Sequence, residues 1–346
     1  MNKLLLLSYL IIIYLFNTAC SEEQATDDMQ AGDEQSQVTE SDDNSKNPVD
    51  MNQVDMSCYQ ECLAKGETDD LCLSVCADFK DEADKNIAEA IDLLVDNETR
   101  QYRIFTPSTM QTSMPVIVFF HGGGGRNSEF PQQSKFEALA ENQGIILIFA
   151  MGEARDGEEG DWLLNTTANR QQDIRYLETL LESVTNTYSV DQSRIYAVGY
   201  SLGSMYTYEV ACHLSHRFTA IASYAGSMPI NPSSCEQSRA LSIMHIHGVD
   251  DPIISYDESW DWKAWDIVGS MFDIPGLIQY WSTKYDCQSQ DEVTFNEGIH
   301  ISHTDCIGDT SIEHYRLTNS GHEWPQQINQ VSTHQVIWEF LSTFSQ

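Results

Sequence analysis

The sequence predicts an α/β domain over residues 95–346, built on a mostly parallel central sheet with helices on both faces. Short apolar runs alternate with longer segments whose apolar residues recur every three or four positions, the order of a layered α/β fold. A second observation is a glycine-flanked serine, Gly199-Tyr200-Ser201-Leu202-Gly203, directly after one predicted strand. The third is length, since about 250 residues in this order fit one domain.

Each predicted element has its own local signal. Val116 to Phe120 and Ile145 to Phe149 are continuous apolar runs, as expected for strands buried on both faces. Gly144 closes the helix between them, and Ile174, Leu177 and Leu181 mark one face of a longer helix. In chain order we expect strands at 100–105, 116–120, 145–149, 194–198, 220–224, 242–247 and 313–317, and helices at 134–142, 174–188, 204–214, 275–285 and 334–344.

Residues 1–20 form a predicted signal peptide. A short basic start precedes an apolar run from Leu4 to Phe16, which is too short to span a bilayer comfortably. The small residues before Cys20 resemble the lipobox of bacterial lipoproteins, although Asn17 departs from that pattern, and ordinary cleavage near Ala19 is the alternative. We expect a protein that is secreted or held at the outer cell envelope, touching a membrane only through its signal or a lipid on Cys20.

Composition defines the segment that follows and excludes some partners. Residues 21–57 are rich in Glu, Asp, Gln, Ser and Thr, which predicts a disordered acidic linker. The whole chain has 53 acidic against 18 basic residues and a formal charge of -35. Nucleic acid is therefore a poor candidate partner, and none is expected; we also expect a monomer.

The cysteines fit an oxidising compartment. Nine are present, and the eight that remain beside Cys20 are an even number. Four of them form two pairs with three residues between the members, so each pair lies on one face of a helical turn. We expect a disulfide-stapled helical hairpin within residues 58–94 rather than a zinc site, with the bonds Cys58–Cys76 and Cys62–Cys72.

A glycine run follows the strand at 116–120. In His121-Gly122-Gly123-Gly124-Gly125, the missing side chains let backbone N–H groups approach a carbonyl oxygen closely. We expect the N–H groups of Gly123 and Leu202 to form an oxyanion hole. A phosphate loop is the alternative, but its Gly-Lys-Ser/Thr ending is missing.

The pattern Gly-x-Ser-x-Gly around Ser201 is that of a nucleophile elbow, which predicts Ser201 as a nucleophile. Two later motifs supply its partners. His247-Gly248-Val249-Asp250-Asp251-Pro252 follows a late strand, where either aspartate can fix the tautomer of an imidazole. His322 lies in Ser320-Gly321-His322-Glu323-Trp324-Pro325, placed to take the proton of Ser201 and return it to a leaving alcohol. The order Ser, Asp, His along the chain is that of the α/β-hydrolase fold.

Together these motifs resemble the polyhydroxybutyrate depolymerase and feruloyl esterase family of secreted α/β-hydrolases, from about Arg100 to the C-terminus. The resemblance includes Asp161-Trp162 and Gly321-His322-x-Trp324-Pro325, whereas Ser204 stands where the family often has a second glycine. It implies the α/β-hydrolase fold and a catalytic set of Ser201, Asp251 and His322, because the family acid stands three residues after the His-Gly glycine and before a proline.

The remaining cysteines also look like those of the family. A bond between Cys287 and Cys306 would brace the His322 loop, and Cys212 with Cys235 is a second expected pair, with a buried free Cys212 as the alternative.

The resemblance implies a serine esterase that hydrolyses carboxylic esters through an acyl-enzyme, like a feruloyl esterase or a polyhydroxybutyrate depolymerase. The expected partner is a small-molecule or polymer-linked ester substrate. Two alternatives stay open, an acetylxylan esterase-type deacetylase and a catalytically idle binding module. The aromatic segment 256–265 follows the acid, so we expect it to form a wall of the substrate pocket, against the alternative of a lid-like helix with its own core. The candidate substrate-binding residues are Trp162, Tyr200, Trp260, Trp262, Trp265 and Trp324.

No motif for a cofactor is present. His300, His303 and Asp305 are the remaining candidate metal ligands, but they have neither helical spacing nor a defined third partner. We therefore expect no metal and no cofactor, and water as the only co-reactant.

Overall fold

The computed structural model describes residues 90–125, 135–155, 159–165, 171–232, 235, 237–262 and 268–346. The predicted signal peptide and acidic linker lie outside the described residues, as does the cysteine hairpin except for residues 90–94. The same holds for Cys20, for the expected pairs Cys58–Cys76 and Cys62–Cys72, and for Trp265.

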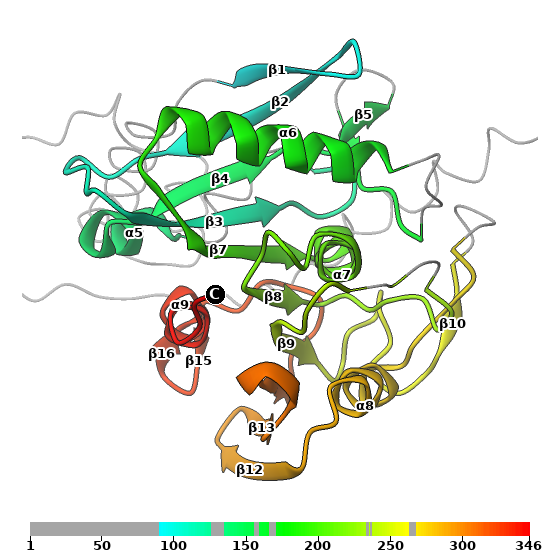
Figure 1. The fold of residues 1–346 in the computed structure, drawn as a ribbon. Coiled ribbons are helices and arrows are strands. Elements are labelled where there is room, and N and C mark those ends of the chain that lie inside the picture. Colours follow the sequence, from blue (N-terminus) through cyan, green and yellow to red (C-terminus); the bar gives the residue numbers. More distant parts are fainter. Residues whose placement is uncertain are drawn as a thin grey trace, which may run out of the picture. The chain divides into compact units, whose positions relative to one another are not determined.

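Ten strands form one sheet in the described part of the chain (Figure 1). They are Ile91–Val95 (β1), Glu98–Phe105 (β2), Met114–Phe120 (β3), Ile146–Ala150 (β4), Val190–Tyr200 (β7), Ala220–Tyr224 (β8), Ser242–Gly248 (β9), Ser289–Phe295 (β12), Gly298–Thr304 (β13) and Ile312–Leu317 (β14). The order across the sheet is β1-β2-β4-β3-β7-β8-β9-β14-β13-β12. From β4 to β14 all neighbours are parallel, and the strands added at both edges are antiparallel.

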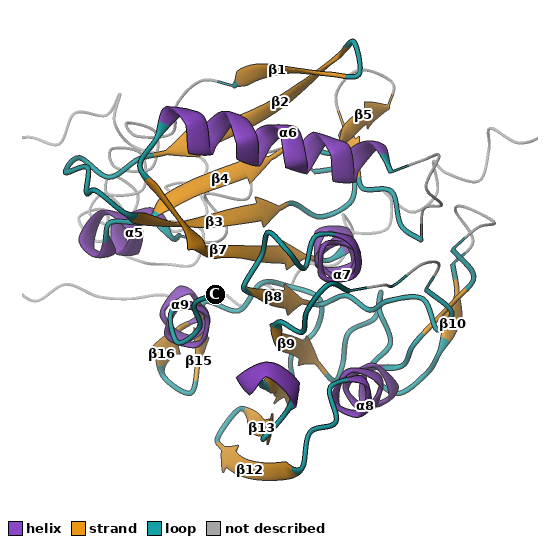
Figure 2. Ribbon diagram, in the orientation of Figure 1, coloured by secondary structure: helices purple, strands orange, loops and turns teal. Residues whose placement is uncertain are grey.

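Helices cover both faces of the sheet (Figure 2). Gln172–Thr187 (α6), Leu202–His213 (α7) and Ile274–Lys284 (α8) pack on one face, and Glu137–Gln143 (α5) and Thr333–Leu341 (α9) pack on the other. Because both sides of the central strands are covered, β3 and β4 are buried along their whole length and apolar throughout. These observations confirm the predicted α/β layering.

The edges of the sheet differ from the prediction. The sheet begins at Ile91, before the expected domain start at residue 95, because β1 pairs with β2. The strands β12 and β13 were not predicted, since β12 is exposed along most of its length and lacks an apolar alternation. Short two-stranded hairpins form at Glu153–Arg155 with Glu159–Asp161 (β5, β6), Trp260–Asp261 with Ser270–Met271 (β10, β11) and Gln327–Ile328 with Val331–Ser332 (β15, β16).

Two disulfides are present among the described residues. Cys212 is bonded to Cys235, so it is not a free thiol, and Cys287 is bonded to Cys306. The second bond lies near the start of β14, because His303 pairs with Ile312, whereas His322 follows the other end of that strand. The expectation that this bond braces the His322 loop is therefore wrong.

Within the described ranges, no helix is both long and apolar enough to cross a membrane.

Candidate active site

Ser201 stands at the sharp turn between β7 and α7. Its backbone has φ 54° and ψ -120°, a strained conformation for a residue with a side chain. The flanking glycines make the turn possible: a Cβ on Gly199 would lie 2.2 Å from the Gly203 oxygen, and one on Gly203 would lie 2.1 Å from the Phe120 oxygen. The serine side chain is thereby raised at the carboxyl edge of the parallel strands, as in a nucleophile elbow.

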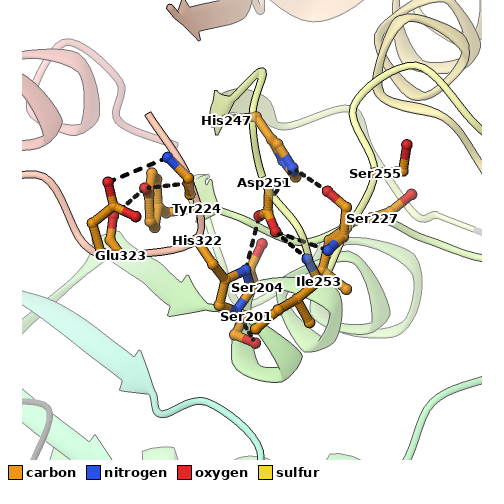
Figure 3. A network of polar contacts seen from close by, with 12 residues as sticks. Ser201, Ser204, Tyr224, Ser227, His247, Asp251, Ile253, Ser255, His322 and Glu323 are labelled. Carbon is orange, nitrogen blue, oxygen red and sulfur yellow. Dashed lines mark hydrogen bonds and ion pairs between the residues drawn. The ribbon is translucent and has the colours of Figure 1, made fainter. Parts of the chain in front are cut away.

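Ser201, His322 and Asp251 form one hydrogen-bonded row (Figure 3). The Ser201 Oγ lies 2.8 Å from His322 Nε2, and His322 Nδ1 lies 2.8 Å from Asp251 Oδ2. Because a carboxylate only accepts, Nδ1 carries the imidazole proton, and Nε2 is left with a lone pair facing the serine hydroxyl. The structure therefore brings together the three residues that the sequence motifs single out, in the arrangement that activates a serine.

The carboxyl group of Asp251 is completely buried and fully hydrogen-bonded. Its Oδ1 accepts from the N–H groups of Ile253 at 2.8 Å and Ile254 at 2.9 Å. Burial alone would raise the pKa of Asp251, yet hydrogen bonds from His247, His322 and the two backbone N–H groups hold it well below its usual range. The acid thus stays ionised while it is shielded from water.

Asp250, the alternative acid, is exposed and has a different contact. Its backbone N–H donates to the Ser320 oxygen at 3.0 Å, and Val249 N–H donates to the Leu317 oxygen at 2.9 Å. These bonds join the loop after β9, which carries Asp251 and is called the acid loop below, to the segment that leads to His322. Gly248 is required at this junction, since a Cβ there would lie 2.2 Å from the Ser320 oxygen.

The glycine loop after β3 lies against the elbow. A Cβ on Gly122 would lie 3.4 Å from that of Ser201, and one on Gly123 would lie 3.3 Å from the Leu202 side chain. Leu202 is the first residue of α7, so its N–H has no acceptor within the helix and lies at the positive end of the helix dipole. Both predicted oxyanion donors, Gly123 and Leu202, are thus neighbours beside the serine.

The side chain of His121 orients this loop. Its Nε2 accepts from Gly152 N–H at 3.0 Å, so Nδ1 carries the proton and donates to the Gly122 oxygen at 2.7 Å. The Gly125 N–H also donates to that oxygen, at 3.1 Å. In a trans peptide the N–H points opposite to the preceding carbonyl, so anchoring the Gly122 oxygen directs the Gly123 N–H away from His121.

The predicted aromatic contacts differ in their exposure and position. Tyr200 is half-buried, and its ring lies 5.3 Å from that of His322, so it borders the reacting groups. Trp324 is buried behind it, with its ring 6.2 Å from Tyr200 and 5.3 Å from Tyr224. Trp162 has no exposed surface, and its Nε1–H donates to the His121 oxygen at 2.9 Å. This burial removes Trp162 as a substrate contact and makes it a support of the glycine loop.

Trp260 and Trp262 belong to the hairpin that follows the acid loop. Both are half-buried, and their rings lie 5.6 Å apart. The hairpin is fixed to the loop after β8 by the Ile230 N–H, which donates to the Ser270 oxygen at 2.8 Å. That loop includes Gly226, where a Cβ would lie 2.9 Å from the Ser201 backbone oxygen, so one loop contacts both the hairpin and the backbone of the serine.

Sequence reasoning missed two histidines behind the acid. His245 and His247 in β9 are completely buried, and the Nε2 of His247 lies 3.4 Å from Asp251 Oδ2. Their signal was present in the sequence, because residues two apart on a strand share a face.

The histidines of β13 have other contacts. His300 Nε2 lies 2.5 Å from the Glu313 carboxylate, and its ring stacks on Tyr315 at 4.2 Å. In the part of the chain that the structure describes, no group of three or more His, Cys, Asp or Glu side chains could hold a metal ion.

The fold and the hydrogen-bonded row define an α/β-hydrolase with a Ser-His-Asp arrangement. Known proteins agree: the family model described as phospholipase/carboxylesterase matches residues 102–263. The chain resembles the acetyl xylan esterase from Aspergillus awamori with a TM-score of 0.56 and 14% identity, covering 74% of this chain and 99% of that one. At this identity, the likeness shows the fold alone.

Curated relatives include a bifunctional acetylxylan esterase/xylanase of Neocallimastix patriciarum, 20% identical over 71% of this chain and 33% of that protein. Feruloyl esterase B of Thermothelomyces thermophilus is 31% identical over 38% of this chain and 46% of that protein. The chain thus spans about a third to a half of the length of these relatives. The matches confirm the resemblance to feruloyl esterases at the level of the family, and its polyhydroxybutyrate depolymerase part stays a prediction.

Proposed function

We propose that this chain is a serine hydrolase of carboxylic esters. The observation that carries the proposal is the row in which Ser201 Oγ and Asp251 Oδ2 each lie 2.8 Å from one nitrogen of His322. Gly123 and Leu202 beside the serine supply the two N–H donors that such a reaction needs.

The reaction runs in two halves. Ser201 Oγ attacks the ester carbonyl carbon while His322 Nε2 takes the hydroxyl proton, and the N–H groups of Gly123 and Leu202 stabilise the oxyanion. His322 then gives the proton to the departing alcohol, which leaves an acyl group on Ser201. Water attacks this acyl-enzyme with the same proton transfers in reverse order, releasing the carboxylic acid and free Ser201. Asp251 stays ionised throughout and stabilises the imidazolium.

We propose an aromatic acyl group, such as feruloyl, as the preferred substrate moiety. Tyr200 beside His322 and the half-buried Trp260 and Trp262 one loop away offer flat apolar surface for a phenolic ring. The names of the feruloyl esterase relatives agree with this choice. An acetyl group on xylan is the second candidate, favoured by the names of one curated relative and one structural neighbour.

We also infer that the protein works outside the cytoplasm. Two disulfides join described cysteines, and such bonds persist in oxidising compartments. Anchoring through a lipid on Cys20 remains a proposal. Treatment of producing cells with labelled palmitate tests it, because label on the parent protein and none on a Cys20→Ala variant is the expected result.

Hydrolysis of a substrate panel tests the function. Methyl ferulate, acetylated xylan, p-nitrophenyl butyrate and hydroxybutyrate oligomers are offered to the parent protein and to Ser201→Ala. We expect turnover with the highest kcat/KM on methyl ferulate, and loss of turnover in the variant by about 10⁵-fold or more. A preference for acetylated xylan would move the assignment to the deacetylase.

An idle binding module is the competing class. It has no need of a serine hydroxyl facing an imidazole lone pair, which is what the 2.8 Å contact between Ser201 and His322 provides. Binding of methyl ferulate without turnover on any ester of the panel, by a folded protein, would favour that class.

A further inference from the structure

A continuous row of buried polar groups lies behind Asp251, on the side away from Ser201. Tyr208 comes from α7, and His245 and His247 come from β9. Each of the three residues is at most 1% exposed. Tyr208 Oη lies 2.8 Å from His245 Nδ1, and His245 Nε2 lies 3.1 Å from His247 Nδ1. The row ends at His247 Nε2, which lies 2.9 Å from the Ile254 oxygen and 3.4 Å from Asp251 Oδ2.

The acceptors at the His247 end of the row determine which nitrogen of each imidazole ring carries the proton. Both groups that His247 Nε2 faces, a carbonyl and a carboxylate, only accept, so this nitrogen carries the proton. In the neutral ring, His247 Nδ1 then accepts, and His245 Nε2 must donate to it. His245 Nδ1 accepts in turn from the Tyr208 hydroxyl. The hydrogen bonds therefore all run in one direction, from α7 towards the acid.

The surroundings keep His245 and Tyr208 neutral. Burial, followed by the neighbouring His247 and His314, holds the pKa of His245 well below its ordinary value. Burial likewise raises the pKa of Tyr208, so its hydroxyl keeps its proton. The other polar groups that face the row are Ser223 of β8, whose Oγ lies 3.3 Å from His245 Nδ1, His314 and Arg316 of β14, and Tyr256 of the acid loop.

We propose that His247, supported by His245, is a positioning residue for the catalytic acid. The shorter hydrogen bond of His247, at 2.9 Å, anchors the Ile254 carbonyl, and the Ile253 and Ile254 N–H groups of the same turn hold Asp251 Oδ1. The longer contact reaches Oδ2, the oxygen that accepts from His322. His247 thus fixes both the turn and the carboxylate, which sets the plane in which His322 is held.

This role follows because the Ile254 carbonyl and the Asp251 carboxylate both face the same N–H group, that of His247 Nε2. Without a donor at the position of His247 Nε2, the Ile254 oxygen loses its partner in a buried site, and the turn is held less firmly. Asp251 keeps its charge through its other bonds, so the expected defect is a misaligned imidazole rather than a lost acid. Such a defect lowers kcat and leaves KM nearly unchanged.

The first measurement does not depend on activity. Histidines labelled with ¹⁵N report which ring nitrogen carries the proton, and we expect His245 and His247 to be neutral with the proton on Nε2. In the same spectra we expect a strongly deshielded proton between His322 and Asp251. A proton on Nδ1 of His247, or a charged His247 at pH 7, would overturn the row as described.

The second measurement rests on the proposed function and compares four variants. His247→Phe removes the donor, His247→Gln keeps an N–H near the position of Nε2, and His245→Phe removes the support. His314→Phe is the matched control, because His314 is equally buried on the same face but bonds to Tyr256 and to the His245 carbonyl. Each variant is first shown to be folded by circular dichroism and by its unfolding midpoint.

We expect His247→Phe to lower kcat on methyl ferulate by about tenfold to a hundredfold with KM within about twofold, and to shift the His322–Asp251 proton signal. His247→Gln recovers about tenfold, His245→Phe loses less, and His314→Phe stays within about twofold of the parent. Equal losses in His247→Phe and His314→Phe, or an unshifted proton signal, would overturn the proposal. A parent protein that hydrolyses no ester refutes the proposed function, while the proton signals still decide on the row.

Discussion

The reacting groups and the aromatic hairpin are built by opposite means. Hydrogen bonds join the side chains of Ser201, His322 and Asp251, and backbone segments approach so closely that only glycine fits at Gly199 and Gly203. The hairpin is joined to the loop after β8 by backbone bonds, and the buried Nε1–H of Trp260 has no acceptor among the described residues. An unsatisfied buried donor costs about 1–3 kcal/mol.

This difference indicates that the reaction and the selectivity for particular esters depend on different parts of the molecule. A nucleophile and its base must be held within a few tenths of an ångström, so their supports are close contacts that tolerate no added atom. A wall that admits a ring needs area and shape rather than fixed polar geometry. We therefore expect changes near Ser201 to abolish turnover of all esters, and changes in the hairpin to alter the order of preference among them.

The largest effect is expected at the acid. Asp251→Asn keeps the shape but presents an N–H or a neutral oxygen to His322, so kcat falls by about 10⁴-fold. Asp250→Asn is the matched control, since Asp250 is exposed and touches the site only through its backbone N–H. Steady-state kinetics on p-nitrophenyl butyrate compares the two, and a larger loss in the Asp250 variant would assign the acid to that residue.

The next effect is on stability at the elbow. Gly203→Ala places a Cβ 2.1 Å from the Phe120 oxygen and 2.4 Å from the His121 oxygen, so we expect the free energy of unfolding to fall by about 3 kcal/mol or more. In Gly269→Ala the new Cβ meets no atom within 4 Å, and only the φ of +76° opposes it, at about 1–2 kcal/mol. Urea unfolding measures both. Equal losses would show that steric overlap at the elbow is not what requires glycine.

The hairpin prediction is smaller and depends on the substrate. Trp260→Ala combined with Trp262→Ala should lower kcat/KM on methyl ferulate by about tenfold through KM, because ring contact is lost. Turnover of p-nitrophenyl acetate, which has no acyl ring, should stay within about twofold. A loss of the same size on both esters would mean that the tryptophans support the fold and do not select the acyl group.

The smallest expected effect concerns a second buried carboxyl group. Glu137 in α5 has a buried Oε1 without a hydrogen-bond partner among the described residues, and burial raises its pKa to about 7, against a weaker lowering by a backbone hydrogen bond. Because the folded state holds this proton more tightly than the unfolded state, the contribution of Glu137 to stability is greatest below about pH 4.5 and is lost as the pH rises to about 7. Asp251 behaves in the opposite sense, since its pKa is depressed and its contribution is lost only in strong acid.

Glu137→Gln removes the charge that the folded state disfavours. We expect the variant to be more stable than the parent by about 1–2 kcal/mol at pH 8 after its partial exposure is allowed for, and to show no gain at pH 4. Unfolding midpoints at the two pH values measure this. An equal gain in stability at both pH values would show that packing, and not charge, causes the effect.

The sequence was sufficient to predict the central strands and the grouping of Ser201, Asp251 and His322. Val116 to Phe120 and Ile145 to Phe149 are apolar because helices cover both faces of the sheet, so their burial could be predicted from their composition. The chemistry of Ser201 and His322 was readable because the elbow and the glycine loop need residue types that few other structures need.

Other features depend on three-dimensional neighbours and could not be read. The aromatic character of Trp162 is the same in a pocket wall and in a core, and only the structure shows that Phe120 and Tyr206 enclose it. His245 and His247 acquire a direction only when Tyr208 from α7 and the Ile254 carbonyl are placed at the two ends of the row. Exposed strands such as β12 carry too few apolar residues to be recognised.

Covalent labelling of Ser201 tests the proposed chemistry most directly. The folded protein is treated with a fluorophosphonate, and the adduct is located by peptide mass spectrometry. We predict one adduct per chain on Ser201, absent from Ser201→Ala and retained in Ser204→Ala, whose buried hydroxyl bonds to Ser223 instead of His322. No adduct on the folded parent, or an adduct that persists in Ser201→Ala, would contradict the assignment of Ser201 as the nucleophile.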